Sequence, residues 1–295
     1  MRSDGFAGIG GRAPGTSSDN LAEAQSPSFI AEDDRLRSRY MRRLIQEAER
    51  SDAQRAPSTV PRVLVQFWDN PTTMPADVGE CLDSWRPLEE QGFERLLFDD
   101  QGARGFIAKH FGRRYSAAFE QCRHPAMRCD YFRLCFIARN GGFYVDADDF
   151  YQGGDCEYLF RDNRLKLQPL CYDMSTGTMV QTEVFTSNDD DSPNWIFYVN
   201  NNPLVAPPHH PVIRLALARS TQILLSHADD RPDIQSTTGP GNLTASLVRH
   251  AVVSELAGRA RDFAILPTWD VIAVSRWPLS YRSDERNWRL WSQSQ

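Results

Sequence analysis

Short apolar segments alternate with amphipathic segments between residues 61 and 150, and this alternation limits the fold more than any other feature of the sequence. The shorter segments have the length of buried strands, and the longer ones repeat apolar residues every three to four positions, as helices do. The expected strands cover residues 62–67, 93–98 and 143–145, and the helices residues 75–86, 100–110, 113–121 and 125–139. The alternation predicts an α/β fold with a mostly parallel central sheet flanked by helices.

The second half of the chain has a less regular pattern. The expected strands cover residues 170–174, 178–186, 195–200 and 263–267, a turn covers 188–191, and helices cover 211–225 and 242–256. These assignments rest on apolar periodicity and on turn residues between the segments. We therefore assign residues 61–295 to one globular domain.

The first sixty residues differ in composition from the rest. Residues 1–28 are rich in Gly, Ser, Ala and Pro, which predicts a disordered tail. Residues 29–60 predict a helix followed by a linker, an N-terminal helical extension that docks on the core or meets a partner. The apolar residues of this helix fall on one face: Leu36, Tyr40, Leu44 and Ile45.

The overall composition restricts the partners of the protein. Its net charge of −6 argues against nucleic acid, which requires a basic face, and its 41% hydrophobic residues suffice for a sizeable core. No segment resembles a transmembrane helix or a secretory signal, so we expect a cytoplasmic protein, with a membrane-peripheral enzyme or a secreted effector as alternatives. The six cysteines form no CxxC pair, and we expect reduced core thiols rather than disulfides.

An acidic motif follows the third expected strand directly. Asp146 and Asp148 are separated by one residue, and Asp149 comes next. Ligands of open α/β sheets bind beyond the carboxyl ends of the strands, and carboxylates there can hold Mg²⁺ or Mn²⁺. Such a cation can neutralise the charge of a departing nucleotide diphosphate. The alternative for an isolated Asp-x-Asp is a solvated acidic turn.

The helix before this strand carries a second pair of charged residues. Asp130 and Arg133 are three positions apart and share one helix face. Asp130 lies among apolar neighbours, where a charge needs a partner or a ligand. The pair predicts either a sugar-binding group beside the acidic motif or a simple helix salt bridge.

Together these segments resemble a known family. The string Arg128-x-Asp130-x-x-Arg133, followed by Gly141-Gly142-x-Tyr144-x-Asp146-x-Asp148, resembles glycosyltransferase family 32. That family includes initiating mannosyltransferases and bacterial capsular polysaccharide transferases, with the clostridial glucosylating toxins more distant. Weaker matches occur in the same order along the chain, at residues 61–68, 84–85, 201–211 and 238–240.

The resemblance implies a GT-A-like fold and a retaining hexosyltransferase that takes sugar from a UDP- or GDP-sugar donor. It implies Mn²⁺ or Mg²⁺ held by Asp146 and Asp148, with Asp130 and Arg133 acting beside them in catalysis. The acceptor would be a saccharide, a lipid-linked saccharide or a protein. The donor-binding positions that it implies are Gln66, Trp68, Arg128, Asp130, Arg133, Gly142, Tyr144, Asp146, Asn201, Asn287 and Trp288.

Two of these positions are less firmly matched. Trp68 suits stacking on a nucleobase, and a core tryptophan is the alternative. Asn287-Trp288 stands where the family has Ser-Trp, and Asp284 or Glu285 stands where it has a late metal ligand.

Two other functions fit parts of the sequence. A haloacid dehalogenase-type phosphatase also has Asp-x-Asp after a strand, and it needs a downstream lysine, for which Lys166 is the candidate. A non-catalytic sugar-nucleotide-binding adaptor could keep the scaffold without turnover. Phosphomonoester hydrolysis identifies the first, and nucleotide binding without turnover identifies the second.

Overall fold

A computed structural model describes residues 27–47, 58–187, 192–226, 233–276 and 278–289. The helices are α2 (Pro27–Gln46), α3 (Ala76–Ser84), α4 (Pro87–Glu90), α5 (Asp100–Phe111), α6 (Arg113–Glu120), α7 (Pro125–Asn140), α8 (Thr182–Ser187), α9 (Pro211–Ser226), α10 (Ile234–Thr237) and α11 (Pro240–Leu256). The strands are β1 (Val63–Phe67), β2 (Glu94–Phe98), β3 (Gly142–Tyr144), β4 (Asp149–Tyr151), β5 (Leu165–Leu167), β6 (Pro169–Asp173), β7 (Thr178–Val180), β8 (Trp195–Val199), β9 (Leu204–Ala206), β10 (Phe263–Ile265) and β11 (Ala273–Ser275).

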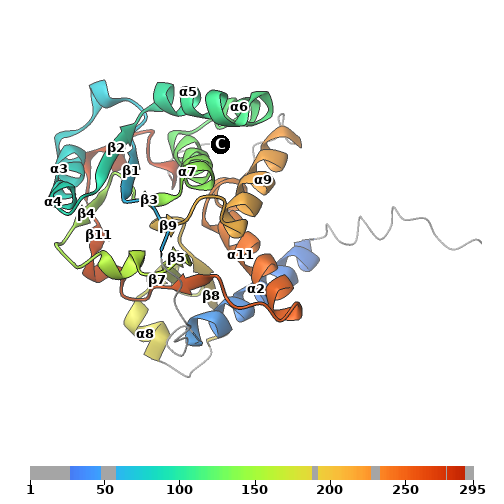
Figure 1. Cartoon of the computed structure of the whole chain (residues 1–295). Coiled ribbons are helices and arrows are strands. Elements are labelled where there is room, and N and C mark those ends of the chain that lie inside the picture. Colours follow the sequence, from blue (N-terminus) through green and yellow to red (C-terminus); the bar gives the residue numbers. More distant parts are fainter. Residues whose placement is uncertain (1–26, 48–57, 188–191, 227–232, 277, 290–295) are drawn as a thin grey trace, which may run out of the picture.

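The central sheet has six strands in the order β10-β5-β9-β3-β1-β2 (Figure 1). β1 pairs in parallel with β2 and β3, and β10 pairs in parallel with β5. β9 runs antiparallel to both of its neighbours, β3 and β5. The predicted α/β fold with a mostly parallel central sheet flanked by helices is confirmed.

Both faces of this sheet are covered, as the near-continuous apolar sequence of its strands requires. Successive residues of a strand point to opposite faces. Val65 and Tyr144 belong to a core formed with α5, α6, α7, α9 and α11. Leu64 and Phe143 belong to a second core, which is formed with Trp85, α4 and the residues around Trp269. The sheet thus lies between two hydrophobic layers.

The Gly141-Gly142 pair allows α7 to end close to the sheet. Both glycines have positive φ, at 69° and 109°, a region that side chains rarely adopt. A Cβ on Gly141 would lie 2.6 Å from the backbone nitrogen of Pro208, and one on Gly142 would lie 2.9 Å from the carbonyl oxygen of Val63. The pair therefore sets the sharp turn that leads from α7 into β3.

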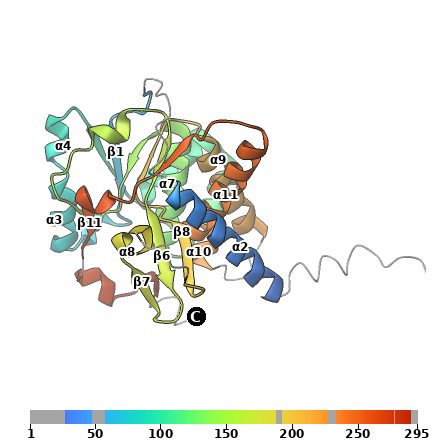
Figure 2. The same cartoon turned by 90° about the horizontal axis from the view of Figure 1, so that it is seen from below.

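A smaller sheet of three strands lies beside the central one, in the order β7-β6-β8, with antiparallel pairing throughout. Helix α2 packs across β8 and α11 (Figure 2). Met41, Leu44 and Ile45 of α2 are buried. The predicted helix thus docks on the core, but Leu36 is 55% exposed and Met41 is buried, so the predicted apolar face was partly wrong.

The predicted strand over residues 178–186 is wrong in its second half. Only Thr178–Val180 is a strand, and Thr182–Ser187 forms α8. β-Branched residues favour strands only weakly, and tertiary packing overrides that preference. Here the short helix places the side chain of Phe185 in the core, where it is buried. The predicted turn at 188–191 and most of the predicted tail at 1–28 lie outside the described residues.

Candidate functional site

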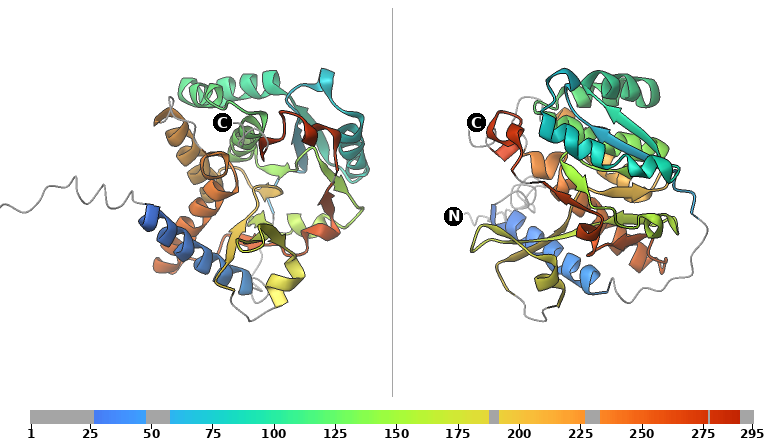
Figure 3. Two further views of the ribbon diagram at one scale, coloured as in Figure 1. Left: turned by 180° about the vertical axis from the view of Figure 1, so that it is seen from behind. Right: turned by 90° about the vertical axis from the view of Figure 1, so that its left-hand side faces the viewer.

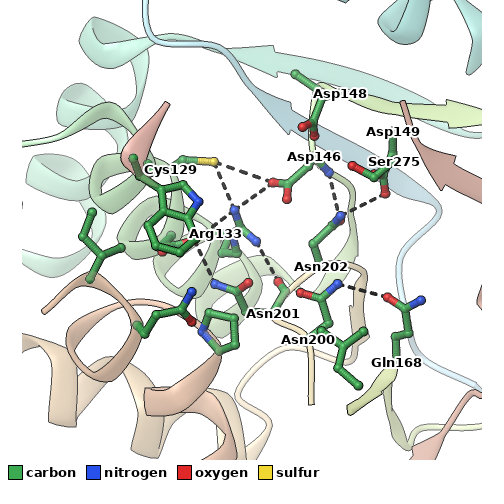
Figure 4. A pocket seen from close by; sticks show the side chains of 18 of the residues that line it. Cys129, Arg133, Asp146, Asp148, Asp149, Gln168, Asn200, Asn201, Asn202 and Ser275 are labelled. Atoms are coloured by element: carbon green, nitrogen blue, oxygen red, sulfur yellow. Dashed lines mark hydrogen bonds and ion pairs between the residues drawn. The ribbon is translucent and has the colours of Figure 1, made fainter. Parts of the chain in front are cut away.

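One large cavity lies beyond the carboxyl end of β3, between the central sheet, the smaller sheet and the C-terminal segment. Its volume is about 730 Å³, within the range of small-molecule sites. The residues that line it include both charged pairs of the sequence motifs: Asp130, Arg133, Asp146 and Asp148. Figure 4 shows Arg133, Asp146 and Asp148 together on its wall.

Asp146 occupies the centre of a dense hydrogen-bond network. Its Oδ1 accepts hydrogen bonds from Arg133 Nη2 at 2.7 Å and from Tyr144 Oη at 3.0 Å. The Cys129 thiol lies 3.8 Å from the same oxygen and 2.8 Å from the Tyr144 hydroxyl. The Arg133 guanidinium also lies over the Tyr144 ring, 4.4 Å from its centre. α7 and β3 thus hold this carboxylate in one orientation.

Arg133 connects Asp146 to Asp130. Its Nη2 lies 3.0 Å from Asp130 Oδ1, and its Nη1 donates to the carbonyl oxygen of Asn201 at 2.8 Å. Asp130 also accepts hydrogen bonds from Asn201 Nδ2 at 2.8 Å and from Thr238 Oγ1 at 3.2 Å. Both oxygens of Asp130 therefore accept hydrogen bonds from protein groups. The pair is a buried salt bridge, as one alternative predicted, and it also lines the cavity; its predicted contact with a sugar stays a prediction.

The backbone after β3 is fixed by a neighbouring asparagine. The amide of Asp146 donates to Asn202 Oδ1 at 2.9 Å, and Asn202 Nδ2 donates to Asp149 Oδ2 at 2.9 Å. Gln66 Nε2 lies 3.5 Å from the carbonyl oxygen of Asp146. The asparagine run after β8 thus holds the acidic motif from the side of β9.

Asp148 has a different environment. Its Oδ2 accepts a hydrogen bond from Tyr281 Oη at 2.7 Å and pairs with the Arg282 guanidinium. Both partners lie in the C-terminal segment, residues 278–289, which crosses the carboxyl edge of the sheet (Figure 3, dark red). Sequence reasoning missed Tyr281 and Arg282, because no periodic or spaced pattern links them to residue 148.

The negative charge of the motif is concentrated. Burial, and then the charges of Asp148 and Asp130, raise the pKa of Asp146 to about 6, although Arg133 acts in the opposite direction. Burial and the charges of its two neighbours also hold the pKa of Asp149 well above its usual range. A bound cation would relieve this repulsion.

The donor set fits a divalent cation in part. Asp146 and Asp148 offer carboxylate oxygens to one cavity, as Mg²⁺ and Mn²⁺ require. Among the described residues, no group of three His, Cys, Asp or Glu side chains forms a complete metal site. Mg²⁺ is commonly held by one or two carboxylates together with substrate phosphates and water, so two protein ligands are sufficient.

Trp68 follows β1 and lines the cavity. Only 7% of it is exposed, and its indole nitrogen has no hydrogen-bond partner among the described residues. Tyr281 meets the ring edge-on, with 5.3 Å between ring centres, and the Arg286 guanidinium lies 5.6 Å from the ring centre. The unpartnered indole nitrogen is itself buried, so the ring is the part of Trp68 that a ligand in the cavity could contact.

The remaining predicted positions differ in whether they line the cavity. Asn201, Asn287 and Trp288 line the cavity, whereas Asp284 and Glu285 are not part of its lining. Four further predicted donor-binding residues are not part of the lining: Gln66, Arg128, Gly142 and Tyr144. Arg128 pairs with Asp100 at 2.8 Å, and Gly142 and Tyr144 are buried in β3.

Comparisons with known proteins are sparse. No family model matches the sequence, and no curated protein matches it either. A solved structure named PaToxG Glycosyltransferase aligns with 88% of this chain and 94% of its own, at 13% sequence identity and a TM-score of 0.46. Values this low do not transfer a function.

All six cysteines are free thiols, as predicted. No helix in the described part of the chain has the length and apolar character needed to cross a membrane.

Proposed function

We propose that the protein is a glycosyltransferase that moves a sugar, with retention of configuration, from a nucleotide-sugar donor to an acceptor hydroxyl. The observation that carries the proposal is the convergence of Asp146, Asp148, Asp130 and Arg133 on one cavity at the carboxyl end of a central strand. A GT-A-like fold places its donor at this edge of the sheet.

The residues of the cavity take distinct parts in this proposal. Asp146 and Asp148 hold Mg²⁺ or Mn²⁺, which supplies positive charge for the leaving diphosphate. Trp68 offers its ring to the nucleotide. Asp130 and Arg133, fixed by Asn201, orient the donor sugar. A rigid network suits this task, because positioned groups need no reorganisation during the reaction.

The chemistry is a substitution at the anomeric carbon of the donor sugar. The bond from this carbon to the diphosphate oxygen breaks, and the acceptor oxygen forms a new bond on the same face. The acceptor proton passes to the departing diphosphate. We assign no protein nucleophile to this step.

The structure offers less support for a phosphatase. Lys166 is a buried residue of β5 and is not part of the cavity lining. Its Nζ lies 2.6 Å from Asp162 Oδ1. The downstream lysine of that mechanism is therefore not beside Asp146. A test for hydrolysis of p-nitrophenyl phosphate should find no activity above background.

The proposal is tested by thermal shift with UDP- and GDP-sugars in the presence of Mn²⁺, followed by measurement of donor hydrolysis. A ligand at a hundred times its Kd stabilises the folded state by about 2.7 kcal/mol, which is easily detected. Asp146→Asn should lower donor turnover at least about a hundredfold.

Asp83→Asn is the matched control, because Asp83 is exposed in α3. This variant should keep wild-type turnover. A full set of nucleotide sugars that gives no shift, or full turnover in Asp146→Asn, would contradict the proposal.

A further inference from the structure

The smaller sheet has one buried face and one open face. Tyr172 lies opposite both Met179 and Ile196, and Leu170 lies opposite Tyr198. Residues that are directly opposite in antiparallel strands share a face, so all five side chains belong to one surface. On the other face, Cys171 and Phe197 are buried.

This open face is apolar and continuous with the cavity. Leu170, Met179 and Tyr198 line the cavity, Tyr172 lies on the same face of the sheet, and Met174 begins the turn that follows β6. Met174 is 65% exposed, Met179 48% and Tyr172 37%. Flexible methionine side chains beside an aromatic ring suit the varied side chains of a polypeptide.

The outer edge of this sheet is also open. Within the described part of the chain, β7 pairs with β6 alone and has no strand on its other side. Gln181 and Thr182, which follow β7 directly, line the cavity. An open edge strand is a template for an added strand, and the residues that follow β7 connect this edge to the cavity.

The charge of this region differs from that of the donor end. Asp173 and Glu183 are the charged side chains in the described part of residues 169–199. Glu183 and Asp270 line the cavity at this end, whereas Arg282 and Arg286 line it at the donor end, and Arg289 lines it near Tyr198. The donor diphosphate suits the basic end, and a basic partner suits the acidic end. A lipid-linked acceptor with its own diphosphate would meet like charge.

We propose that the acceptor is an extended polypeptide segment with basic residues, which docks on the open face and the β7 edge of the smaller sheet. Its apolar side chains at alternate positions contact Tyr172, Met174 and Met179. One side-chain hydroxyl reaches into the cavity and receives the sugar, while its proton passes to the leaving diphosphate. The inference rests on the proposed glycosyltransferase function and specifies its acceptor.

The test uses the full chain with Mn²⁺ and UDP-glucose, UDP-N-acetylglucosamine and GDP-mannose, each radiolabelled in the sugar. Three acceptor pools are offered: twelve-residue peptides with a central Ser, Thr or Tyr and basic flanks, the same peptides with acidic flanks, and free mono- and oligosaccharides. We expect label in the basic peptides at least tenfold above the other two pools.

Two double variants separate docking from donor chemistry. Tyr172→Ser/Met174→Ser removes apolar surface that is not part of the donor site, and should lower peptide transfer at least tenfold while donor hydrolysis is unchanged. Val253→Ser/Leu256→Ser, which alters exposed residues of α11, should leave both unchanged.

Donor hydrolysis with label only in saccharides, or peptide transfer that the Tyr172/Met174 variant does not reduce, would overturn this inference and leave the transferase function intact. Absence of hydrolysis with every donor would instead remove the proposed function, and this inference with it.

Discussion

Asp146 and Asp148 are two residues apart, yet they belong to regions of different construction. Asp146 is held by Arg133 and Tyr144, which come from the central helix and strand and are buried. Asp148 is held by Tyr281 and Arg282, which come from a C-terminal segment at the surface of the fold. The first contact is part of the core, and the second joins the C-terminal segment to the edge of the sheet.

The two carboxylates differ in the kind of counter-ion that they have before a ligand binds. A buried carboxylate requires a permanent partner, because leaving it unpaired costs several kcal/mol, on the order of 3–5. The Asp148–Arg282 pair is also shielded, with 15% and 13% of the two side chains exposed, but its cation comes from the C-terminal segment and not from a core helix. We therefore expect Arg133 to be a structural counter-ion and Arg282 to be the partner that a metal ion replaces.

The largest effect is expected at Arg133. Arg133→Met leaves Asp146 and Asp130 without their shared cation, and should lower the free energy of unfolding by about 3–5 kcal/mol in urea titrations. Arg104→Met, which removes an exposed pair with Glu120, should change it by less than about 1 kcal/mol.

The double variant Arg133→Met/Asp146→Asn keeps this prediction testable if Arg133→Met does not fold. It removes both charges and should recover part of the lost stability. Equal losses in Arg133→Met and Arg104→Met would show that the network around Asp146 is not a structural unit.

An intermediate effect is expected at Asp162, a buried carboxylate outside the cavity. Burial alone would raise its pKa, but hydrogen bonds from Arg164 and Lys166 lower it to about 2. A lowered pKa contributes stability above the unfolded value near 4, and this contribution is lost as pH falls from about 4 to about 2. Asp162→Asn should therefore cost about 2 kcal/mol at pH 7.

The free energy of unfolding should depend on pH in opposite directions for Asp162 and Asp146. The raised pKa of Asp146 gives the opposite sign, because its ionisation costs stability as pH rises from about 4 to about 6. In urea titrations between pH 2 and pH 7, Asp162→Asn should converge with the wild type at low pH. A constant gap across this range would contradict the lowered pKa of Asp162.

The smallest effect on stability is expected at Arg282. Arg282→Met should lower the free energy of unfolding by about 1 kcal/mol, and should raise affinity for Mn²⁺ about fivefold, because it frees Asp148. Titration calorimetry with Mn²⁺ alone measures this affinity without turnover. Arg276→Met, which removes a surface pair with Glu80, is the control and should bind Mn²⁺ as the wild type does. Weaker Mn²⁺ binding in Arg282→Met would show that Arg282 supports the metal site.

Much of the fold was predictable because it depends on local pattern. The strands around residues 63–67 and 94–98, helix α7 and the Gly141-Gly142 turn followed from apolar periodicity and turn chemistry. The three-residue strands β4, β5, β9 and β11 are too short to carry a period, and they are strands only because neighbouring strands supply their hydrogen bonds. For the same reason the sequence did not predict β9 or its antiparallel direction.

The residues of the candidate site also divide into those that the sequence could identify and those that it could not. Asp130, Arg133, Asp146 and Asp148 could be identified from sequence, because helix spacing and a strand end fix which side chains lie together. Asn202, Tyr281 and Arg282 could not, since the chain brings them to Asp146 and Asp148 from 56, 133 and 134 positions away.

The sequence by itself determined the central strands and helices and the carboxylates at the edge of the sheet, because these depend on residues near one another in the chain. Only the tertiary structure decided which cation accompanies each carboxylate and which surface adjoins the cavity. Long-range packing places an arginine of the central helix on Asp146, an arginine of the C-terminal segment on Asp148, and an open apolar sheet face beside the cavity.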